Sequence, residues 1–600
     1  MIKINYKDLD EFLNQDRKIT NRFNFENFTL SDKERLSDPI FKSIGYPSKI
    51  FYKNIQPFIN AYTEEGGIVI DSCCGSGSTG IAALLENRKC ILIDNSPHAV
   101  NIAYNIINYV DMNKLEKTYK KMLSELEDEI NGIYYTRTRE GFSGYADIII
   151  ASNVYSCPSC DNEIILYKNE TGKRSEYKCP HCGYVINISK KEIKDRQLDK
   201  RRPVEVTIKV TDKNAPIKKE VREVTEKDVE LWEVKLNEYN KKYEHYWSPE
   251  EKIIYNRCYP RVGGWPGFAI DASVSDLFPA KNLMALKIIN NYIENRIDDE
   301  SIKSFMKFIF LESLFRTSSR LFVSSGIKNV YHIPPVGKEQ NVLTVFKRKY
   351  RDITKAKKYL QNIVDEERIN NNIRIIKGDA QNIDIPSNSV DYAFVDPPYG
   401  GMVPYAELNL FYSAWLNEKE DLENEIIIPM DFEKKDGYVE IWGKYIENAF
   451  GEIYRVLRPG AYFTVVFHSK FNNIWNELKD IMINRLGFEF VNIIENERGT
   501  TFHTNHINDT NPVSAFITYR KPENECIVTK ENILVESQEV FKFFDKNILK
   551  EGRTYREIQS KIIFLCHEHS ISIPSDKEIK QWLERICDRK DGYYFLKSSF

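Results

Sequence analysis

The chain has 600 residues, of which 42% are hydrophobic and 29% are charged, and its formal net charge is -3. This composition is typical of soluble globular proteins with several hydrophobic cores, and no apolar run approaches the roughly 20 residues that a membrane span needs. Because the net charge is close to zero, any surface for nucleic acid has to come from local clusters among the 85 lysines and arginines.

The N-terminal residues are polar and of mixed charge, unlike a signal peptide, so we expect a cytoplasmic protein with no membrane partner. Of the eleven cysteines, four lie in two C-x-x-C pairs and the others are scattered through apolar segments. This distribution favours a metal site in a reducing compartment over a set of disulfides.

The first regular pattern along the chain is a strand, a glycine-rich turn, a helix and a second strand. Apolar residues at 67–71 lead into the turn Asp71-Ser-Cys-Cys-Gly-Ser-Gly77, and a second apolar run ends at Asp94. Glycines in such a turn let the backbone approach a ligand, and a carboxylate after the next strand can accept hydrogen bonds from a ribose. The glycine spacing departs from G-x-G-x-x-G, which disfavours an NAD enzyme.

A predicted helix follows over residues 97–110, and then the alternation of strands and helices is interrupted over residues 111–371. Within this insertion lie Cys157-Pro-Ser-Cys160 and Cys179-Pro-His-Cys182, eighteen residues apart. Four thiolates at this spacing suit a tetrahedral, structural Zn²⁺, and a redox role is much less favoured. We therefore expect a zinc ribbon at about residues 155–187, with His181 outside the ligand set.

The rest of the insertion has a charge-dense stretch, 190–242, with one clear strand at 204–210, and helical periodicity between 283 and 363. Two basic clusters, Lys200-Arg-Arg202 and Lys347-Arg-Lys-Tyr-Arg351, have the chemistry to neutralise phosphates, but each is as readily a solvated helix face. The apolar and basic segment Phe315–Arg320 lies on a helical repeat and is given no specific contact.

Strands are again predicted at 373–376, 390–395, 462–467, 488–494 and 515–519, and helices at 555–566 and 577–587. The chain is therefore expected to be α/β: a Rossmann-like domain in two pieces, split by the insertion, with a small, mostly helical C-terminal domain. The expected divisions are 1–111, 112–371, 372–522 and 523–600.

The loop Asp396-Pro-Pro-Tyr399 directly follows the strand at 390–395, at the edge where open α/β sheets bind ligands. An amino nitrogen on an aromatic ring is a poor nucleophile, and the Asp396 carboxylate and the Pro397 carbonyl can accept its two hydrogens and favour a reactive geometry. Pro398 stiffens the loop, and Tyr399 offers a face on which a base can stack. His468 ends the strand at 462–467 and is either part of the base pocket or a bystander.

These motifs resemble those of the amino-methyltransferases that act on DNA, whose cofactor motif is D-x-F-C-G-S-G-T and whose catalytic motif is D/N/S-P-P-Y. The resemblance implies S-adenosylmethionine as the cofactor, with Cys73 in place of the phenylalanine that closes over it. Lys377-Gly-Asp379-Ala380 resembles a third cofactor motif, which meets the adenine of the cofactor, and Tyr46-Pro-Ser-Lys49 resembles Y-P-x-K-F, which covers its methionine end. The candidate cofactor residues are Tyr46, Pro47, Lys49, Asp71, Cys73, Gly75, Ser76, Gly77, Asp94, Asn95, Asp379 and Ala380.

The stretch 396–415 is similar to D-P-P-Y-x-x-x-x-x-Y-x-E-L-x-x-F-x-x-x-W of adenine-specific DNA methylases that contain a zinc ribbon. This likeness implies methylation of the N6 amino group of an adenine flipped out of duplex DNA, with the insertion recognising the DNA, in a restriction-modification or phage-defence setting with other subunits. Three alternatives stay open: a cytosine-N4 enzyme, an RNA enzyme of the guanine-N2 type, and an inactive DNA-binding subunit.

Overall fold

The structure is a computed structural model, and it describes residues 9–13, 17–24, 32–47, 49–173, 175–198, 201–253, 272–320, 333–399, 403, 405–427, 437–469, 471–495, 513–524, 539–569 and 571–598. The apolar runs beside the glycine turn and before Asp396 form neighbouring strands of a seven-stranded sheet, in the order β12-β2-β1-β13-β14-β16-β15. Its strands are β1 (Ile68–Asp71), β2 (Lys89–Asp94), β12 (Ile373–Lys377), β13 (Val390–Val395), β14 (Leu457–Ser469), β15 (Glu489–Glu495) and β16 (Val513–Arg520). Neighbouring strands are parallel except where β16 pairs with β14 and β15.

The central strands β1 and β13 are buried along their whole length, and all their residues except Asp71 and Asp391 are apolar or aromatic, because helices cover both faces of the sheet. Val69 of β1 belongs to one hydrophobic cluster, and its neighbours Ile68 and Ile70 belong to another, as expected when successive side chains point to opposite faces. The first cluster includes α4 (Tyr52–Tyr62), α5 (Ser78–Leu85) and α6 (Pro97–Ile107), and the second includes α15 (Tyr438–Val456) and α16 (Asn472–Lys479). The predicted mixed α/β class with a parallel sheet is confirmed.

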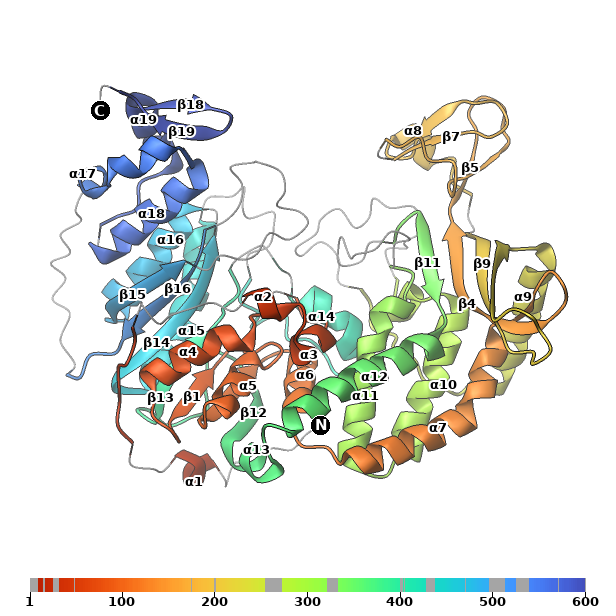
Figure 1. Cartoon of the computed structure of the whole chain (residues 1–600), viewed down its shortest axis with the longest axis horizontal. Coiled ribbons are helices and arrows are strands. Elements are labelled where there is room, and N and C mark those ends of the chain that lie inside the picture. Colours follow the sequence, from red (N-terminus) through yellow and green to blue (C-terminus); the bar gives the residue numbers. More distant parts are fainter. Residues whose placement is uncertain are drawn as a thin grey trace.

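The helices of the insertion share the first of these cores with the sheet. They are α7 (Met112–Ile133), α10 (Ala280–Arg296), α11 (Glu300–Thr317), α12 (Val342–Gln361) and α13 (Glu366–Asn372). α11 is buried on most sides, and it packs on α6 and α12, while α12 also packs on the short helix α3 (Pro39–Ser43). Figure 1 shows this helical bundle beside the sheet. The insertion is therefore continuous with the α/β core.

The charge-dense stretch contributes two strands and a helix to a second, antiparallel sheet, in which β3 pairs with β4 and the main order is β10-β9-β4-β11. Its elements are β3 (Tyr135–Arg137), β4 (Ser143–Ser152), β9 (Arg202–Val210), β10 (Lys219–Glu223), β11 (Val336–Gln340) and the covering helix α9 (Glu226–Lys242). The predicted strand at 204–210 lies within β9.

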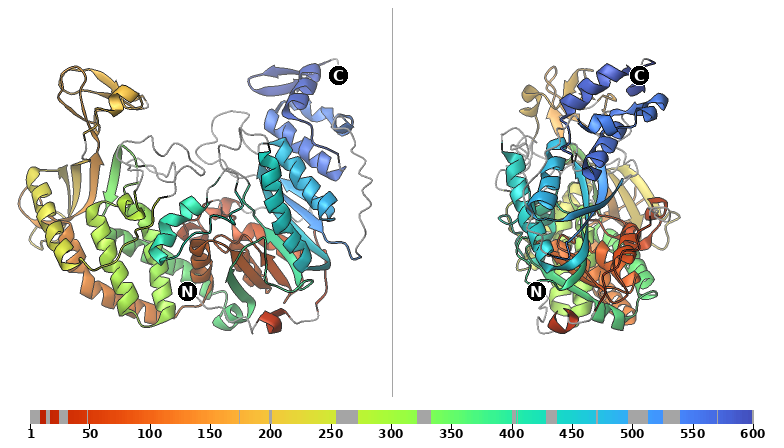
Figure 2. Two further views of the ribbon diagram at one scale, coloured as in Figure 1. Left: turned by 180° about the vertical axis from the view of Figure 1, so that it is seen from behind. Right: turned by 90° about the vertical axis from the view of Figure 1, so that its left-hand side faces the viewer.

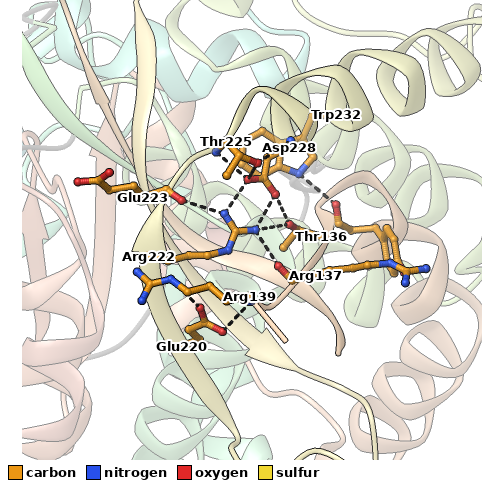
Figure 3. A network of polar contacts seen from close by, with 10 residues as sticks. Thr136, Arg137, Arg139, Glu220, Arg222, Glu223, Thr225, Asp228 and Trp232 are labelled. Atoms are coloured by element: carbon orange, nitrogen blue, oxygen red, sulfur yellow. Dashed lines mark hydrogen bonds and ion pairs between the residues drawn. The ribbon is translucent and has the colours of Figure 1, made fainter. Parts of the chain in front are cut away.

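A buried ion pair joins β10 to α9 (Figure 3). The guanidinium nitrogens of Arg222 lie 2.6 and 2.7 Å from the two carboxylate oxygens of Asp228, and both side chains are less than a tenth exposed. Thr136 of β3 donates its hydroxyl hydrogen to the same carboxylate at 2.5 Å, and Asp228 also forms a capping box with Thr225 at the start of α9. Three elements are thus fastened at one point.

The cysteine pairs lie in a small ribbon that projects from the end of β4 (Figure 1). Its elements are β5 (Val154–Ser156), β6 (Glu163–Ile165), β7 (Glu176–Lys178), β8 (Val185–Asn187) and α8 (Lys191–Lys194). The ribbon has a hydrophobic cluster of its own, separate from the two main clusters. In both views of Figure 2 it rises on the same side of the molecule as the C-terminal domain.

The C-terminal domain contains the two expected helices and also a sheet that we did not expect. The elements are α17 (Val540–Phe543), β17 (Arg553–Thr554), α18 (Tyr555–Glu568), α19 (Asp576–Ile586), β18 (Cys587–Lys590) and β19 (Tyr593–Leu596). The predicted "mostly helical" character is therefore incomplete: β18 and β19 form a hairpin through Asp591-Gly592, both with positive φ, a turn sequence that we overlooked.

The remaining described elements are short. They are the helices α1 (Leu9–Leu13), α2 (Asp32–Arg35) and α14 (Tyr405–Ser413), the 3-10 turns Val274–Leu277, Ala414–Leu416 and Lys546–Glu551, and a π-helix at Asp480–Arg485. None of the helices in the described ranges is long and apolar enough to cross a membrane.

Candidate active site

The glycine turn and the Asp396 loop meet at one edge of the sheet because β1 and β13 are adjacent and parallel, with Val69 opposite Tyr392 and Ile70 opposite Ala393. A cleft of about 970 Å³, partly open to solvent, lies at this edge. Of the predicted site residues it is lined by Tyr46, Pro47, Lys49, Asp71, Cys73, Gly75, Ser76, Asp94, Asn95, Asp379, Ala380, Asp396 and Pro398. The topology therefore collects four separate sequence motifs around one space.

The glycine turn has a left-handed backbone at Gly75 and Gly77, with φ of 50° and 79°. A Cβ at Gly75 would lie 2.9 Å from the Tyr46 ring, so only glycine lets the turn and the Tyr46 side chain come this close. Gly77 is not among the cleft-lining residues: a Cβ there would meet Ala103 of α6 at 3.0 Å. Its place in the structure is therefore at the start of α5, where it allows close helix packing.

Two aspartates fix the turn, the buried Asp71 and the partly exposed Asp94. Asp94 accepts hydrogen bonds from the backbone N–H groups of Gly75 at 2.9 Å and Ser96 at 3.0 Å, and burial raises the pKa of Asp94 to about 6. Asp71 accepts from the Thr79 hydroxyl at 2.5 Å and from the Cys73 backbone at 3.1 Å, and burial raises its pKa to about 7. Both carboxylates line the cleft while they also shape its floor.

The Asp396 loop divides into residues that line the cleft and residues that do not. Asp396 and Pro398 line it, and the Pro398 carbonyl accepts a hydrogen bond from the Trp442 indole at 3.3 Å. The Tyr399 ring is buried outside the cleft, and its centroid lies 5.7 Å from that of Phe467 and 5.0 Å from that of His468. His468 therefore lies beside Tyr399, near the end of β14. The residues that line the cleft do not include Pro397, Tyr399 or His468.

Tyr46 forms a wall of the cleft between the glycine turn and α14. Its ring stacks on Tyr405, with centroids 6.2 Å apart and planes 17° apart. The preceding Gly45 donates its N–H to the carboxylate of Glu312 at 3.1 Å, and Lys349 pairs with the same oxygen at 3.1 Å. Lys49 donates to two carbonyls of the same segment, and burial lowers its pKa to about 8. Insertion helices α11 and α12 thus hold this wall.

Four cleft residues from one short segment were missed by our sequence reasoning: Glu420, Asp421, Asn424 and Glu425. Glu420 accepts hydrogen bonds from the hydroxyls of Ser96, at 3.1 Å, and Ser413, and burial raises its pKa to about 8. The sequence does show a high density of acidic residues directly after Trp415. This density could have pointed to the segment, but it is also typical of an ordinary solvated turn.

The four predicted metal ligands come together in the ribbon. The Sγ atoms of Cys157, Cys160, Cys179 and Cys182 all lie within 4.8 Å of one another. Each pair occupies the turn of a hairpin in which the first cysteine makes the same bonds: Cys157 donates its N–H to Asn162 and Cys179 to Tyr184. His181 is exposed and is not part of the cluster. Four thiols at this separation fit a single tetrahedral Zn²⁺.

Most charges of the two basic clusters have partners within the protein. Arg201 donates to the carbonyls of Ala151 and Ser319, and Arg202 pairs with Glu163 at 2.6 Å. Lys347 pairs with Glu127 and Arg351 with Asp352, while Lys200 lies outside the described residues.

Of the basic segment after α11, Arg320 is buried. Its guanidinium lies 5.3 Å from the centroid of the Phe315 ring and 5.0 Å from that of Phe411 on α14. This contact joins the end of α11 to the helix that follows the Asp396 loop.

Comparison with known proteins bears on the cofactor half of this site. Residues 1–105 match the model of a DNA methylase family, the N6/N4 methyltransferases. The matched part contains the Tyr46 segment, the glycine turn and Asp94. It supports a DNA methyltransferase and does not distinguish an adenine N6 from a cytosine N4 acceptor. No curated protein matches the chain.

Solved structures share only part of the chain. A Thermus thermophilus protein described as a putative DNA modification methylase, complexed with S-adenosyl-L-methionine, is 18% identical over 28% of this chain and 59% of its own, with a TM-score of 0.15. A SAM-dependent methyltransferase from Methanosarcina mazei is 14% identical over 25% and 68%, with a TM-score of 0.14. The cyclase SpnF is 14% identical over 26% and 60%, with a TM-score of 0.15. This chain therefore spans about 60% of the length of the Thermus protein and the cyclase, and TM-scores this low carry no argument.

Proposed function

We propose that this protein is an S-adenosylmethionine-dependent DNA methyltransferase that methylates the N6 amino group of an adenine extruded from duplex DNA. The observation that carries the proposal is the shared cleft: adjacent parallel strands bring the glycine turn and Asp396 to one space. The partial match to a DNA methylase family supports the same activity. The choice of adenine rests on the D-P-P-Y sequence and the likeness of residues 396–415 to adenine-specific methylases.

The charge of the cleft suits the cofactor. S-adenosylmethionine carries a sulfonium and an ammonium group, and it supplies an electrophilic methyl group when bound. The cleft is lined by the acidic side chains of Asp71, Asp94, Asp379, Asp396, Glu420, Asp421 and Glu425, with Lys49 as its one lysine among the described residues. Burial raises the pKa of Asp71 to about 7 and that of Glu420 to about 8, so these two side chains contribute only part of a negative charge near pH 7. Asp94 lies at the end of β2, where a carboxylate can accept hydrogen bonds from a ribose. A cationic adenosine compound therefore fits these residues.

The reaction chemistry is assigned to the Asp396 loop. The carboxylate of Asp396 and the carbonyl of Pro397 would accept the two hydrogens of the target amino group and hold its lone pair toward the cleft. Tyr399 would have to turn away from Phe467 and His468 to stack on the base, a contact worth about 1 to 3 kcal/mol. The four ribbon cysteines would hold a structural zinc ion, which takes no part in methyl transfer.

The test is a methyl-transfer assay with product identification. Wild-type protein, Asp396→Ala and the control Asp588→Asn, an exposed residue of β18, are incubated with tritiated S-adenosylmethionine and either duplex DNA or bulk tRNA. The products are digested to nucleosides and the labelled nucleoside is identified. We expect labelled N6-methyldeoxyadenosine from the wild type and the control, and at least a hundredfold less from Asp396→Ala, since a lost electrostatic contact at the reacting group costs roughly this much.

Each other result selects an alternative. Labelled N4-methyldeoxycytidine would replace the target base and keep the mechanism. Label in tRNA alone would favour the RNA enzyme, and DNA binding without label would favour an inactive subunit. A restriction or defence setting, with partner subunits, stays a prediction that co-purification from the native cell would test.

A further inference from the structure

A second pocket lies in the insertion, and its lining residues come from α7, β4, β9 and α12 rather than from the candidate active site. Figure 1 shows where these elements lie. It is a half-open depression whose space, open solvent included, is about 550 Å³, and it is lined by Asn131, Tyr145, Lys209, Leu343, Thr344, Lys347, Arg348 and Arg351. Half of these residues are cationic. The others include a hydroxyl and an amide that can donate hydrogen bonds.

The positive charge of this basic pocket is only partly neutralised. Lys347 pairs with Glu127 at 2.6 Å, and Arg351 pairs with Asp352 at 2.9 Å. Asp147, the other nearby carboxylate, accepts a hydrogen bond from the Thr344 hydroxyl at 2.7 Å. Lys209 lies with its ammonium group 5.7 Å from the Tyr145 ring centroid. Four lysines and arginines thus face three carboxylates. The neighbouring helix α11 adds a further positive charge, that of Arg316.

Arg348 is the group that most needs an anion. In the part of the chain that the structure describes, its guanidinium donates only to the neutral Gln340 side chain, at 3.1 Å. Burial and the nearby charge of Arg316, in the last turn of α11, lower the pKa of Arg348, and the carboxylates of Asp352 and Asp147 offset only part of this effect. A half-buried guanidinium next to a second guanidinium is unfavourable unless an anion joins them.

We propose that this basic pocket binds a backbone phosphate of duplex DNA. The inference rests on the proposed function, because that function needs a DNA-binding surface that the net charge of -3 does not supply. The pocket is also connected to the active site. Arg316, whose charge acts on Arg348, lies in the last turn of α11, and Arg320, just beyond that end, packs on Phe411 of α14, which follows the Asp396 loop. A phosphate contact here would position the duplex without reading its sequence.

The test measures DNA affinity against salt concentration, without cofactor. Fluorescence anisotropy of a labelled duplex is recorded with the full-length protein, with Arg348→Ala and Lys209→Ala, and with the control Lys120→Ala. Lys120 is an exposed α7 residue paired with Glu116, so the control removes one positive charge elsewhere. The slope of log K against log salt is negative, and we expect each pocket variant to make it less steep by about 0.9, the value for one lost phosphate contact. Each variant should also weaken binding roughly three- to tenfold at about 0.1 M salt. The control should keep the wild-type slope.

Lys209 is exposed, so Lys209→Ala keeps the test valid even if Arg348→Ala fails to fold, as thermal unfolding would show. Slopes equal to that of the control in both variants would overturn the proposal. So would loss of inorganic phosphate binding with an unchanged slope for DNA. A reduced slope in a protein that binds DNA but never methylates it would support the pocket and contradict the proposed function, so the two failures are distinguishable.

Discussion

At the scale of single residues, Glu312 shows how a distant part of the chain shapes the cleft of the candidate active site. It lies on α11 in the insertion, yet its carboxylate accepts the Gly45 N–H at the base of the Tyr46 wall. A Cβ at Gly45 would lie only 3.2 Å from that carboxylate, so the contact also depends on glycine. Glu312 therefore acts as a positioning residue for Tyr46.

We predict that Glu312→Ala weakens S-adenosylmethionine binding about tenfold, because it removes the acceptor of the part-buried Gly45 N–H and leaves the largely buried Lys349 ammonium unpaired, and an unpaired buried donor costs about 1–3 kcal/mol. Glu312→Gln keeps an oxygen acceptor for Gly45 and should restore most of the affinity. Isothermal titration calorimetry gives the dissociation constants. The matched control is Glu294→Ala, which breaks a pair with Lys307 at 2.5 Å on the far side of the bundle. Equal affinities in Glu312→Ala and this control would contradict the prediction.

A site residue could be predicted from the sequence when the residues that it contacts lie close to it in the chain. The Asp396 loop and the cysteine pairs are local patterns, and the strands beside them are apolar runs, so neighbouring residues specify them. Glu312 and Glu420 reach the cleft through hydrogen bonds to residues 267 and 324 positions away. The local sequence of Glu312 does not distinguish it from the many exposed glutamates of the chain, and Glu420 is marked only by the acidic residues after Trp415, which resemble a solvated turn. Tyr399 was recognised, but its orientation depends on Phe467 and His468, which the loop sequence does not contain.

At the scale of secondary-structure elements, the Arg222–Asp228 pair fastens β10, β3 and α9 together. Burial opposes the charge of Asp228, but hydrogen bonds from Arg222, Thr136 and Thr225 outweigh it and hold the pKa of Asp228 well below its ordinary value. The charge-dense stretch 190–242 was expected to hold one strand. It forms a folded layer because this pair lets a very polar segment bury some of its charges in compensated form.

We predict that Asp228→Asn lowers the free energy of unfolding of this layer by about 3 kcal/mol, because Arg222 would stay buried without its counter-charge. Urea denaturation would measure the effect. The unfolding of this layer is monitored by the fluorescence of Trp232 on α9, and it is compared with the signal of the other tryptophans. The control Glu238→Gln breaks an exposed pair with Lys235 on the same helix and should cost less than about 1 kcal/mol. A loss in Asp228→Asn no larger than in the control would count against a fastening role.

The same pair predicts a pH dependence. The folded-state pKa of Asp228 is depressed, so its contribution to stability is fully present above the unfolded-state pKa of about 3.9. It is lost as the pH falls from there through the lower, folded-state pKa. Between pH 7 and pH 5 the wild type should therefore show no loss from this group. Below about pH 4 the difference between wild type and Asp228→Asn should shrink, and a difference that stays constant down to pH 2 would contradict this assignment.

At the scale of the whole molecule, the three hydrophobic clusters predict what unfolds together. The insertion helices share a cluster with one face of the sheet, so the bundle and the α/β domain should unfold as one unit. The ribbon has its own small cluster around Cys157 and Cys179, and we expect a core of this size to need a metal ion for its stability.

We predict that the purified protein carries one zinc ion per chain and that a chelator unfolds the ribbon alone. Elemental analysis would measure the zinc, and hydrogen exchange would show loss of protection at residues 154–187 with β13 still protected. Cys179→Ser should reproduce the chelated state, whereas Cys587→Ser, a buried cysteine in the C-terminal domain, should not. A metal-free protein with a protected ribbon would refute this prediction.

The pairing of β1 with β13 also determines how the chain must fold during its synthesis. β1 ends at Asp71. Its neighbour β2 follows soon after in the chain, but its other neighbour, β13, begins only at Val390, after the entire insertion. At about 5–20 residues per second, a ribosome needs roughly 15 to 60 s to make the intervening chain. During that time one edge of β1 is without its partner and its apolar residues are uncovered, a condition that favours aggregation. The early helices and a chaperone would have to protect this edge, and production of the protein should depend on translation speed and chaperone supply more than its final stability suggests.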